Sequence, residues 1–277
     1  MTVYPLLIHL GRFTLTGYGI MMMLGFLVAG WIYGRELQRR SLDPAVAWDT
    51  VVIAVVGGLV GSKLYFAISV GRIAAAFSRG GLVWYGGLIG GAGAVFAYMW
   101  LKRLPIRSCL DAVSPSLVVG YMLGRVGCFM VNDDYGLPSR LPWAVAFPEG
   151  SPPTTARILS EQFHAALPKG VMPDQVLTVH PTQLYEIALS FVVFWLLWRR
   201  REHRHAAGWL FAVYLVLSSL ERITVEIFRA KDDRILGAIT VAQLLSAGLL
   251  MIGLLLMWRL ARPETEGPQP TLVTGPQ

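Results

Sequence analysis

AVSPSLVVGYMLGRVGCFMV (residues 112–131) is apolar enough and long enough to cross a lipid bilayer as a helix, yet it contains Arg125. A second run, WLFAVYLVLSSLERITVEIF (residues 209–228), contains Arg222. A guanidinium inside a membrane span costs from roughly 2.5 to more than about 10 kcal/mol, so it usually marks a functional site. Because a guanidinium stays charged and matches phosphate geometry, both arginines predict an anionic, phosphorylated ligand.

Apolar windows of this length recur along the whole chain. Its 277 residues are 55% hydrophobic and only 15% charged, which is not the profile of an ordinary soluble domain. We therefore expect an all-α integral membrane protein with seven transmembrane helices in residues 1–261. The predicted spans lie near residues 15–34, 48–70, 82–101, 111–131, 181–198, 208–228 and 236–258. The start lacks the basic segment of a cleaved signal peptide, and residues 262–277 are expected to form a disordered cytoplasmic tail.

Basic residues follow the first, third, fifth and seventh windows, which all end on the same side of a membrane. They are Arg35, Arg39, Arg40, Lys102, Arg103, Arg107, Arg199, Arg200, Arg201, Arg204, Arg259 and Arg262. The positive-inside rule makes that side cytoplasmic and places the N-terminus outside. The net charge of +7 is mostly this bias. It does not indicate nucleic-acid binding, because no basic run is interleaved with aromatic residues that could stack on bases.

The segment 132–179, between the fourth and fifth windows, is rich in proline and too polar for lipid. Within it, WAVAF (143–147) predicts a short strand and ARILSEQFHAAL (156–167) a short helix. A long insert of this kind is usually functional or disordered. We expect a small, ordered periplasmic cap.

With this orientation, polar side chains from five predicted spans collect at one outer depth. They are Tyr18, Tyr85, Arg125, His180, Gln183, Tyr185, Glu186, Arg222, Glu226 and Arg229, and Lys63 lies in the outer half of the second span. The spacing of Arg222, Glu226 and Arg229 predicts one shared helix face. We interpret the collection as a single polar cavity that opens to the outer leaflet.

Structural explanations also exist for these residues. Tyr18 and Tyr85 could belong to the aromatic belt of a membrane protein. Arg222 could form a local pair with Glu226, and Arg229 could extend to lipid headgroups.

Other residues have similar alternatives. His180 precedes a proline and could simply begin a helix. Cys109 and Cys128 lie roughly 28 Å apart along one predicted helix, so they cannot form a disulfide with each other. Cys128 is more typical of a buried apolar residue than of a nucleophile. No spacing of His, Cys and carboxylates suggests a metal site.

Glycines at small-xxx-small spacing predict helices that pack closely. The pairs are Gly57 with Gly61, Gly86 with Gly90, Gly87 with Gly91, and Gly120 with Gly124.

Three motifs together resemble the bacterial phosphatidylglycerol–prolipoprotein diacylglyceryl transferase family. They are GRVGCFMVNDDYG (124–136), HPTQLYE (180–186) and RITVEIFRAKDD (222–233). The resemblance implies a seven-span enzyme of the bacterial inner membrane whose active site faces the periplasmic leaflet. Such an enzyme transfers the diacylglyceryl group of phosphatidylglycerol to the lipobox cysteine of a prolipoprotein, forms a thioether and releases glycerol phosphate. The substrate thiol is the nucleophile, so no cofactor or metal is required.

By motif position, the resemblance makes Arg125 and Arg222 the essential arginines. Further functional positions of the family match Tyr18, Gly136, Glu226 and Arg229. The chain departs from the usual signature at Cys128, Asp133, Tyr85 and Ser218, where the family commonly has Asn, Glu, His and Tyr. These departures leave room for a paralogue with a different thiol acceptor.

The chemistry of these residues suggests a role for each of them in the reaction. Arg125 and Arg222 are expected to hold the phosphodiester and to stabilise charge on the leaving phosphate. The base that deprotonates the thiol is left unassigned; the candidates are His180 and, behind it, Tyr85, Asp133 and Glu186. The expected substrate-binding residues are Tyr18, Asp133, Gly136, Gln183, Tyr185, Glu186, Glu226 and Arg229, and the two glutamates are expected to orient the guanidiniums.

The alternative from another class is a non-catalytic outer-leaflet protein that binds or transports lipid.

Overall fold

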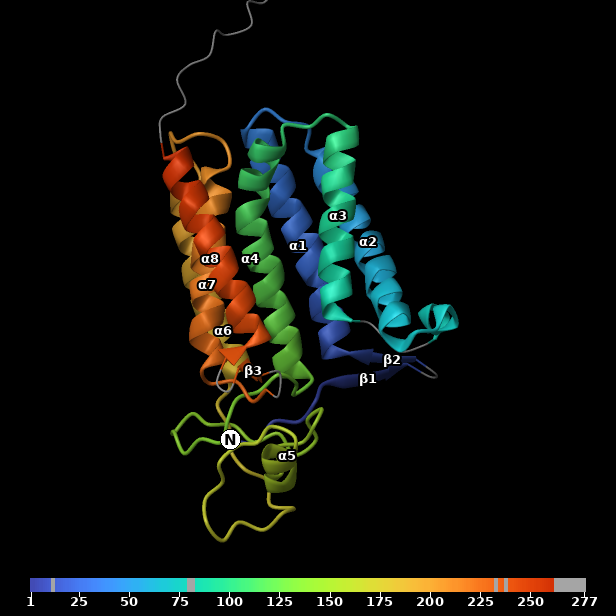
Figure 1. Cartoon of the computed structure of the whole chain (residues 1–277), viewed down its shortest axis with the longest axis vertical. Helices are drawn as coiled ribbons and strands as arrows, with labels where there is room; N and C mark the ends of the chain where they lie inside the picture. The colour runs from blue at the N-terminus through green and yellow to red at the C-terminus, as the bar shows by residue number, and fades with distance from the viewer. Residues whose placement is uncertain (11–12, 79–82, 232–233, 237–238, 262–277) are drawn as a thin grey trace, which may run out of the picture.

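The computed structural model describes residues 1–10, 13–78, 83–231, 234–236 and 239–261, and the predicted tail 262–277 lies outside them. Its long helices stand side by side as an upright bundle, with a smaller lobe at one end (Figure 1). Each predicted span coincides with a helix of 18 residues or more. These helices are α1 (Gly17–Arg39), α2 (Ala45–Val70), α3 (Trp84–Leu101), α4 (Ile106–Met130), α6 (Thr182–Arg200), α7 (Trp209–Glu226) and α8 (Val241–Leu260).

Within the described ranges, four helices are both long enough and apolar enough to cross a membrane. They are α1, α2, α4 and α8, and α3 contributes a shorter apolar helix, Tyr85–Leu101. Many of their large apolar side chains are exposed, for example Ile68 at 80% and Ile89 at 69%. Exposed apolar surface on this scale needs a covering, and the molecule is consistent with a membrane protein.

Helix α4 occupies the middle of the bundle. It packs on α1 on one side and on α6 and α7 on the other, while α2 pairs with α3 and α7 with α8. The neighbouring helices in Figure 1 follow these pairings. A polar side chain that points inward from α4 can therefore meet residues of both α6 and α7.

The contact between α2 and α3 depends on glycine. A Cβ atom added to Gly61 would collide with the carbonyl oxygen of Gly86, and one added to Gly57 would lie 2.9 Å from that of Gly90. The predicted close approach at these glycine pairs is therefore confirmed.

The structure is all-helical in its main elements, as expected, and adds two short hairpins to the helices. Strands β1 (Leu7–Leu10) and β2 (Phe13–Thr16) form an antiparallel hairpin ahead of α1, and β3 (Arg234–Leu236) pairs with β4 (Ile239–Thr240) ahead of α8. These strands have only two to four residues. In a chain this apolar, such short segments carry no alternation that would separate them from the start of a helix.

Residues 132–179 form the lobe at the end of the bundle, and we call this segment the cap (Figure 1). Its helix α5 (Ala156–Glu161) covers only the first half of the predicted helix. The strand predicted at 143–147 is absent; Val145 and Ala146 make only isolated bridges, to Val179 and Thr2. The apolar residues of that segment instead form the core of the cap, where Phe147 is fully buried.

Candidate active site

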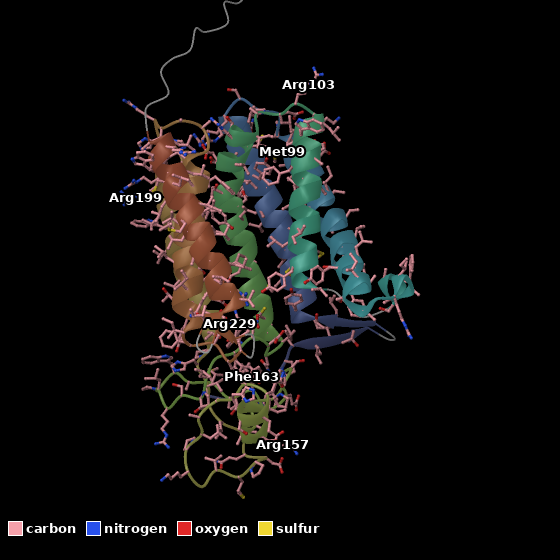
Figure 2. All side chains as sticks on the ribbon, in the orientation of Figure 1. Met99, Arg103, Arg157, Phe163, Arg199 and Arg229 are labelled. Carbon is pink, nitrogen blue, oxygen red and sulfur yellow. The ribbon has the colours of Figure 1, made fainter. Side chains whose placement is uncertain are left out.

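The arginine cluster lies where the bundle meets the cap, and Glu186 of α6 is at its centre. This carboxylate is fully buried. Its Oε2 is 3.1 Å from Nε of Arg125 on α4, and its Oε1 is 3.2 Å from Nη1 of Arg222 on α7. Oε1 also lies 3.3 Å from Nη1 of Arg229. The two arginines that interrupt the apolar runs therefore meet, as the sequence predicts. Figure 2 labels Arg229 at this end of the bundle.

Two further groups hold the arginines in place. The Tyr121 hydroxyl donates to Glu186 Oε1 at 2.7 Å, and the Tyr121 ring lies under the Arg125 guanidinium, 4.9 Å from ring centroid to Cζ. Glu226 lies 3.2 Å from Nη2 of Arg222. The expected local pair of Arg222 and Glu226 exists, but it is one part of a larger network. Tyr121 was not singled out from the sequence; its position one helical turn before Arg125 is the signal that could have identified it.

The expectation that Arg229 shares a helix face with Arg222 and Glu226 is wrong. Helix α7 ends at Glu226, a turn at Ile227 and Phe228 follows, and Arg229 then forms an isolated bridge with Gly136. Its side chain is only 1% exposed and pairs with Glu186 and with Asp134. This burial also rules out the alternative in which Arg229 extends to headgroups.

Asp134 is the acid of the cap that contacts the arginines, although the sequence motif pointed to Asp133. Its carboxylate is 2.7 Å from Nη1 of Arg125, pairs with Arg229, and lies 3.7 Å from Lys231. Burial raises the pKa of Asp134, but Arg229, Arg125 and Lys231 outweigh it and hold that pKa below its ordinary value.

The local backbone explains why Asp134, and not Asp133, contacts the arginines. Asn132 and Asp134 adopt left-handed conformations, with φ of 60° and 65°, which Asn and Asp tolerate better than most residues. The side chain of Asp133 instead accepts a hydrogen bond from the Asp134 amide at 2.7 Å, and its carbonyl accepts one from Gln183 at 2.6 Å. Burial, with the neighbouring Asp134 charge, raises the pKa of Asp133. Spacing alone does not reveal such a turn.

Gly136 lies where three segments cross. Its amide donates to the His180 carbonyl at 2.8 Å, and its backbone forms an antiparallel bridge with Arg229. A Cβ atom here would collide with the Phe228 carbonyl oxygen and would lie 2.8 Å from atoms of both His180 and Thr182. Only glycine allows this approach, which fixes Arg229 against the cap.

The first residues of the α6 segment support the cap. Gln183 is fully buried. The His180 ring approaches the Tyr185 hydroxyl at 3.1 Å through Nδ1 and lies 5.2 Å from the Phe228 ring. Trp143 of the cap donates to the same hydroxyl at 2.8 Å. Burial lowers the pKa of His180, so the neutral imidazole predominates at neutral pH.

The remaining predicted residues lie on α1, α2 and α3. Tyr18, in the first turn of α1, contacts α4 at Gly127 and is 41% exposed. Tyr85 lies in the first turn of α3, which packs chiefly on α2. Lys63 donates to the Ser78 carbonyl at 2.6 Å.

The cluster is electrically balanced in its interior. Three guanidiniums (Arg125, Arg222 and Arg229) face three carboxylates (Glu186, Glu226 and Asp134). Their side chains differ in exposure: 24% for Arg222, 13% for Arg125 and 1% for Arg229. Arg222 and Arg125 can therefore reach a ligand, while Arg229 can only hold its neighbours.

A hollow of about 360 Å³ adjoins the cluster on the cap side. It is lined by Asp133, Asp134, Tyr135, Pro152, Gln162, Phe163, Ala230 and Lys231. Figure 2 shows Phe163 in the cap beside the end of the bundle that carries Arg229. Asp134 thus borders both the hollow and the arginines. Both cysteines are free, and Cys128 Sγ lies 3.9 Å from Nη1 of Arg125.

Comparison with known proteins places the chain. A family model described as prolipoprotein diacylglyceryl transferase matches residues 5–259. Proteins named phosphatidylglycerol–prolipoprotein diacylglyceryl transferase are similar along almost their whole length. One from Trichormus variabilis is 30% identical over 99% of this chain and 94% of its own; one from Nitratidesulfovibrio vulgaris is 30% identical over 95% and 96%. One from Clostridium tetani is 28% identical over 90% and 95%. The chain belongs to the prolipoprotein diacylglyceryl transferase family.

Proposed function

We propose that the chain transfers the diacylglyceryl group of phosphatidylglycerol to the lipobox cysteine of a prolipoprotein at the arginine cluster. The observation that carries this proposal is that Arg125 and Arg222, from two apolar helices, meet on the single buried carboxylate of Glu186. Membership of the family and the names of its relatives support the same activity.

The reaction forms one bond and breaks one. The cysteine sulfur attacks the glycerol carbon that bears the phosphate ester, so that a C–S bond forms as the C–O bond breaks. The electron pair of that bond leaves with the phosphate as glycerol phosphate, and the thiol proton passes to a base. The thiolate is the reactive species. The transition state gathers negative charge on the leaving phosphate, which arginines in a site of low dielectric stabilise strongly.

Arg222 and Arg125 bind the phosphate in this proposal, because theirs are the more exposed guanidiniums of the cluster. Glu186, Glu226 and Tyr121 orient them, and the balanced charge of the cluster offsets the cost of burying three arginines. Arg229 is a positioning residue that links Glu186 to Asp134.

His180 and Asp133 are the candidates for the base. Both lie at the junction of the cap and the bundle. The lowered pKa of His180 keeps its imidazole unprotonated at neutral pH and able to accept a proton, and the raised pKa of Asp133 makes its carboxylate a stronger base than an ordinary aspartate. Glu186 is less suited to the role, because its two oxygens are occupied by three guanidiniums and the Tyr121 hydroxyl.

The proposal includes a topology. The seven long helices span the bacterial inner membrane with the N-terminus outside, so that the arginine cluster and the cap face the periplasm. Prolipoproteins carry the lipobox at the outer end of a membrane-inserted signal segment, and the hollow beside Asp134 lies at this level. The positive-inside distribution of arginine supports this orientation.

The test is a reaction of purified protein with phosphatidylglycerol and a lipobox peptide, followed by mass spectrometry. We expect a thioether-linked diacylglyceryl peptide from the unaltered protein and none from Arg125→Ala or Arg222→Ala. Arg103→Ala, at the other end of the bundle (Figure 2), is the matched control and should retain activity. Full activity in both cluster variants would reject the proposed site. Lipid retention without any thioether would instead indicate a lipid-binding protein or a paralogue with another acceptor.

A further inference from the structure

A second hollow lies at the opposite end of the bundle from the arginine cluster. It has a volume of about 570 Å³. Its walls come from the last turns of α1 and the C-terminal end of α6, and include Trp31, Arg35, Glu36, Arg39, Trp198 and Arg201. Figure 2 marks this end by Arg199, far from Arg229. The proposed transfer reaction uses none of these residues.

The lining carries an excess of positive charge. Glu36 is 2% exposed and is held by Arg39, whose Nη2 lies 2.7 Å from Oε2. Arg201 approaches the same carboxylate at 3.9 Å. Three arginines against one glutamate leave two positive charges uncompensated within the lining. Glu202 also lies near Arg201, at 3.7 Å, but it is 70% exposed and its charge is screened by water.

The guanidiniums are held in place by the walls. The Cζ atom of Arg201 is 3.9 Å from the ring centroid of Trp198, and that of Arg35 is 5.4 Å from the ring centroid of Trp31. Arg39 donates to the Arg201 carbonyl at 2.9 Å. Stacking on an aromatic face leaves the N–H groups at the edge of a guanidinium free for an anion. The hollow is therefore arranged to receive a phosphate-sized anion.

The helix faces below the hollow are apolar and exposed. On α1, Met23, Leu27 and Trp31 follow one another at intervals of four residues, are 58%, 47% and 57% exposed, and lead to Arg35. On α6, Phe191 and Trp195 precede Trp198 at helical spacing and are 60% and 48% exposed. A free phosphate would not contact these apolar faces, whereas the acyl chains of a lipid would cover them.

We propose that this hollow binds the phosphate headgroup of an anionic phospholipid whose acyl chains lie along these rows of α1 and α6. Basic pockets between membrane helices suit such headgroups, and tryptophan favours the interfacial depth. The site is separate from the proposed catalytic site and does not depend on the transfer reaction.

Photo-crosslinking in vesicles tests the proposal. The protein is reconstituted in phosphatidylcholine vesicles that contain phosphatidylglycerol with a diazirine near the top of one acyl chain. Parallel vesicles contain a phosphatidylcholine probe with the same diazirine. Cross-linked peptides are mapped by mass spectrometry, so that labelling at residues 23–39 and 191–201 is counted separately from labelling near the arginine cluster. The variant is Arg35→Gln with Arg201→Gln. Its control is Arg200→Gln with Arg204→Gln, two exposed arginines, which removes the same charge from the same end but outside the hollow.

We expect the phosphatidylglycerol probe to label the two peptides far more than the phosphatidylcholine probe does. Labelling by the phosphatidylglycerol probe should fall by about tenfold in the hollow variant and stay near the original level in the control. General attraction of the basic end to anionic lipid would lower labelling equally in both, since each removed arginine weakens it alike. Equal losses, or equal labelling by the two probes, would overturn the proposal. If the double variant fails to fold, as judged by lost labelling near the arginine cluster, Arg35→Gln against Arg200→Gln makes the same comparison.

Discussion

Arg229 and its acidic neighbours show how a buried charge network can be tested one residue at a time. The side chain is almost completely enclosed and connects Asp134 of the cap with Glu186 of α6. Removing one member of a buried ion pair leaves the other charges uncompensated, which costs about 3–5 kcal/mol. The residue is therefore expected to contribute through its geometry and not through contact with substrate.

Arg229→Gln should lower the free energy of unfolding by about 3–5 kcal/mol, because it removes an almost fully buried guanidinium that pairs with the buried Glu186 and the partly buried Asp134. Arg229→Lys should recover much of that stability, since it restores the charge. It should not recover full activity, because an ammonium cannot bridge two carboxylates with a planar fork. Thermal unfolding in detergent and the rate of thioether formation measure the two effects. A lysine variant with full activity would contradict the positioning role.

The lowered pKa of Asp134 predicts how the stability of the protein depends on pH. Its pKa is lowered in the folded protein, so the unfolded chain binds the proton more tightly. The stability that Asp134 contributes is complete above its unfolded pKa of about 3.9 and is lost as the pH falls below that value. Unfolding temperatures from pH 7 down to about pH 2 measure this loss, which falls in the acidic part of that range. Asp134→Asn should be less stable at neutral pH and should show a weaker decline on acidification. An identical decline in both proteins would contradict the assignment.

At the scale of elements, the cap and the bundle meet at Gly136, where backbone from three segments leaves no room for a side chain. Gly136→Ala is expected to cost about 1–3 kcal/mol of stability, as overpacking usually does, and to reduce activity through the displaced Arg229. The control is Gly248→Ala, because a Cβ atom there meets nothing within 4 Å. Unfolding temperature and thioether yield compare the two. If the Gly136 variant were as stable and active as the Gly248 variant, the predicted clash of a side chain at position 136 would be wrong.

Long helices and their close approaches could be predicted from the sequence, because apolar length and glycine spacing are properties of one segment. The meeting of Arg125 with Arg222 could also be predicted, since two costly charges at one depth need partners. The role of Asp134 could not, because left-handed backbone at Asn132 and Asp134 decides which side chain turns inward. The end of α7 before Arg229 and the irregular cap depend likewise on contacts between segments distant in the chain.

At the scale of the whole molecule, the two ends of the bundle differ in chemistry. One end carries the cap and a network in which arginines are balanced by buried carboxylates. The other carries exposed arginines such as Arg199 and Arg103, labelled at that end in Figure 2. Exposed arginine clusters resist translocation, whereas balanced, buried ones are part of the folded structure. This difference underlies the proposed orientation, with the cap in the periplasm.

Cysteine labelling in whole cells tests that orientation. In a background where Cys109 and Cys128 are replaced by alanine, single cysteines are placed at Arg157 in the cap and at Arg103 at the opposite end (Figure 2). With the outer membrane opened, a maleimide that cannot cross the inner membrane should label Arg157→Cys, whose parent side chain is 57% exposed. Arg103→Cys should react only after the inner membrane is also permeabilised, because the positive-inside rule places that loop in the cytoplasm. The reverse pattern would show that the protein has the opposite orientation in the membrane. Labelling of both sites in intact spheroplasts would show that it has no single orientation.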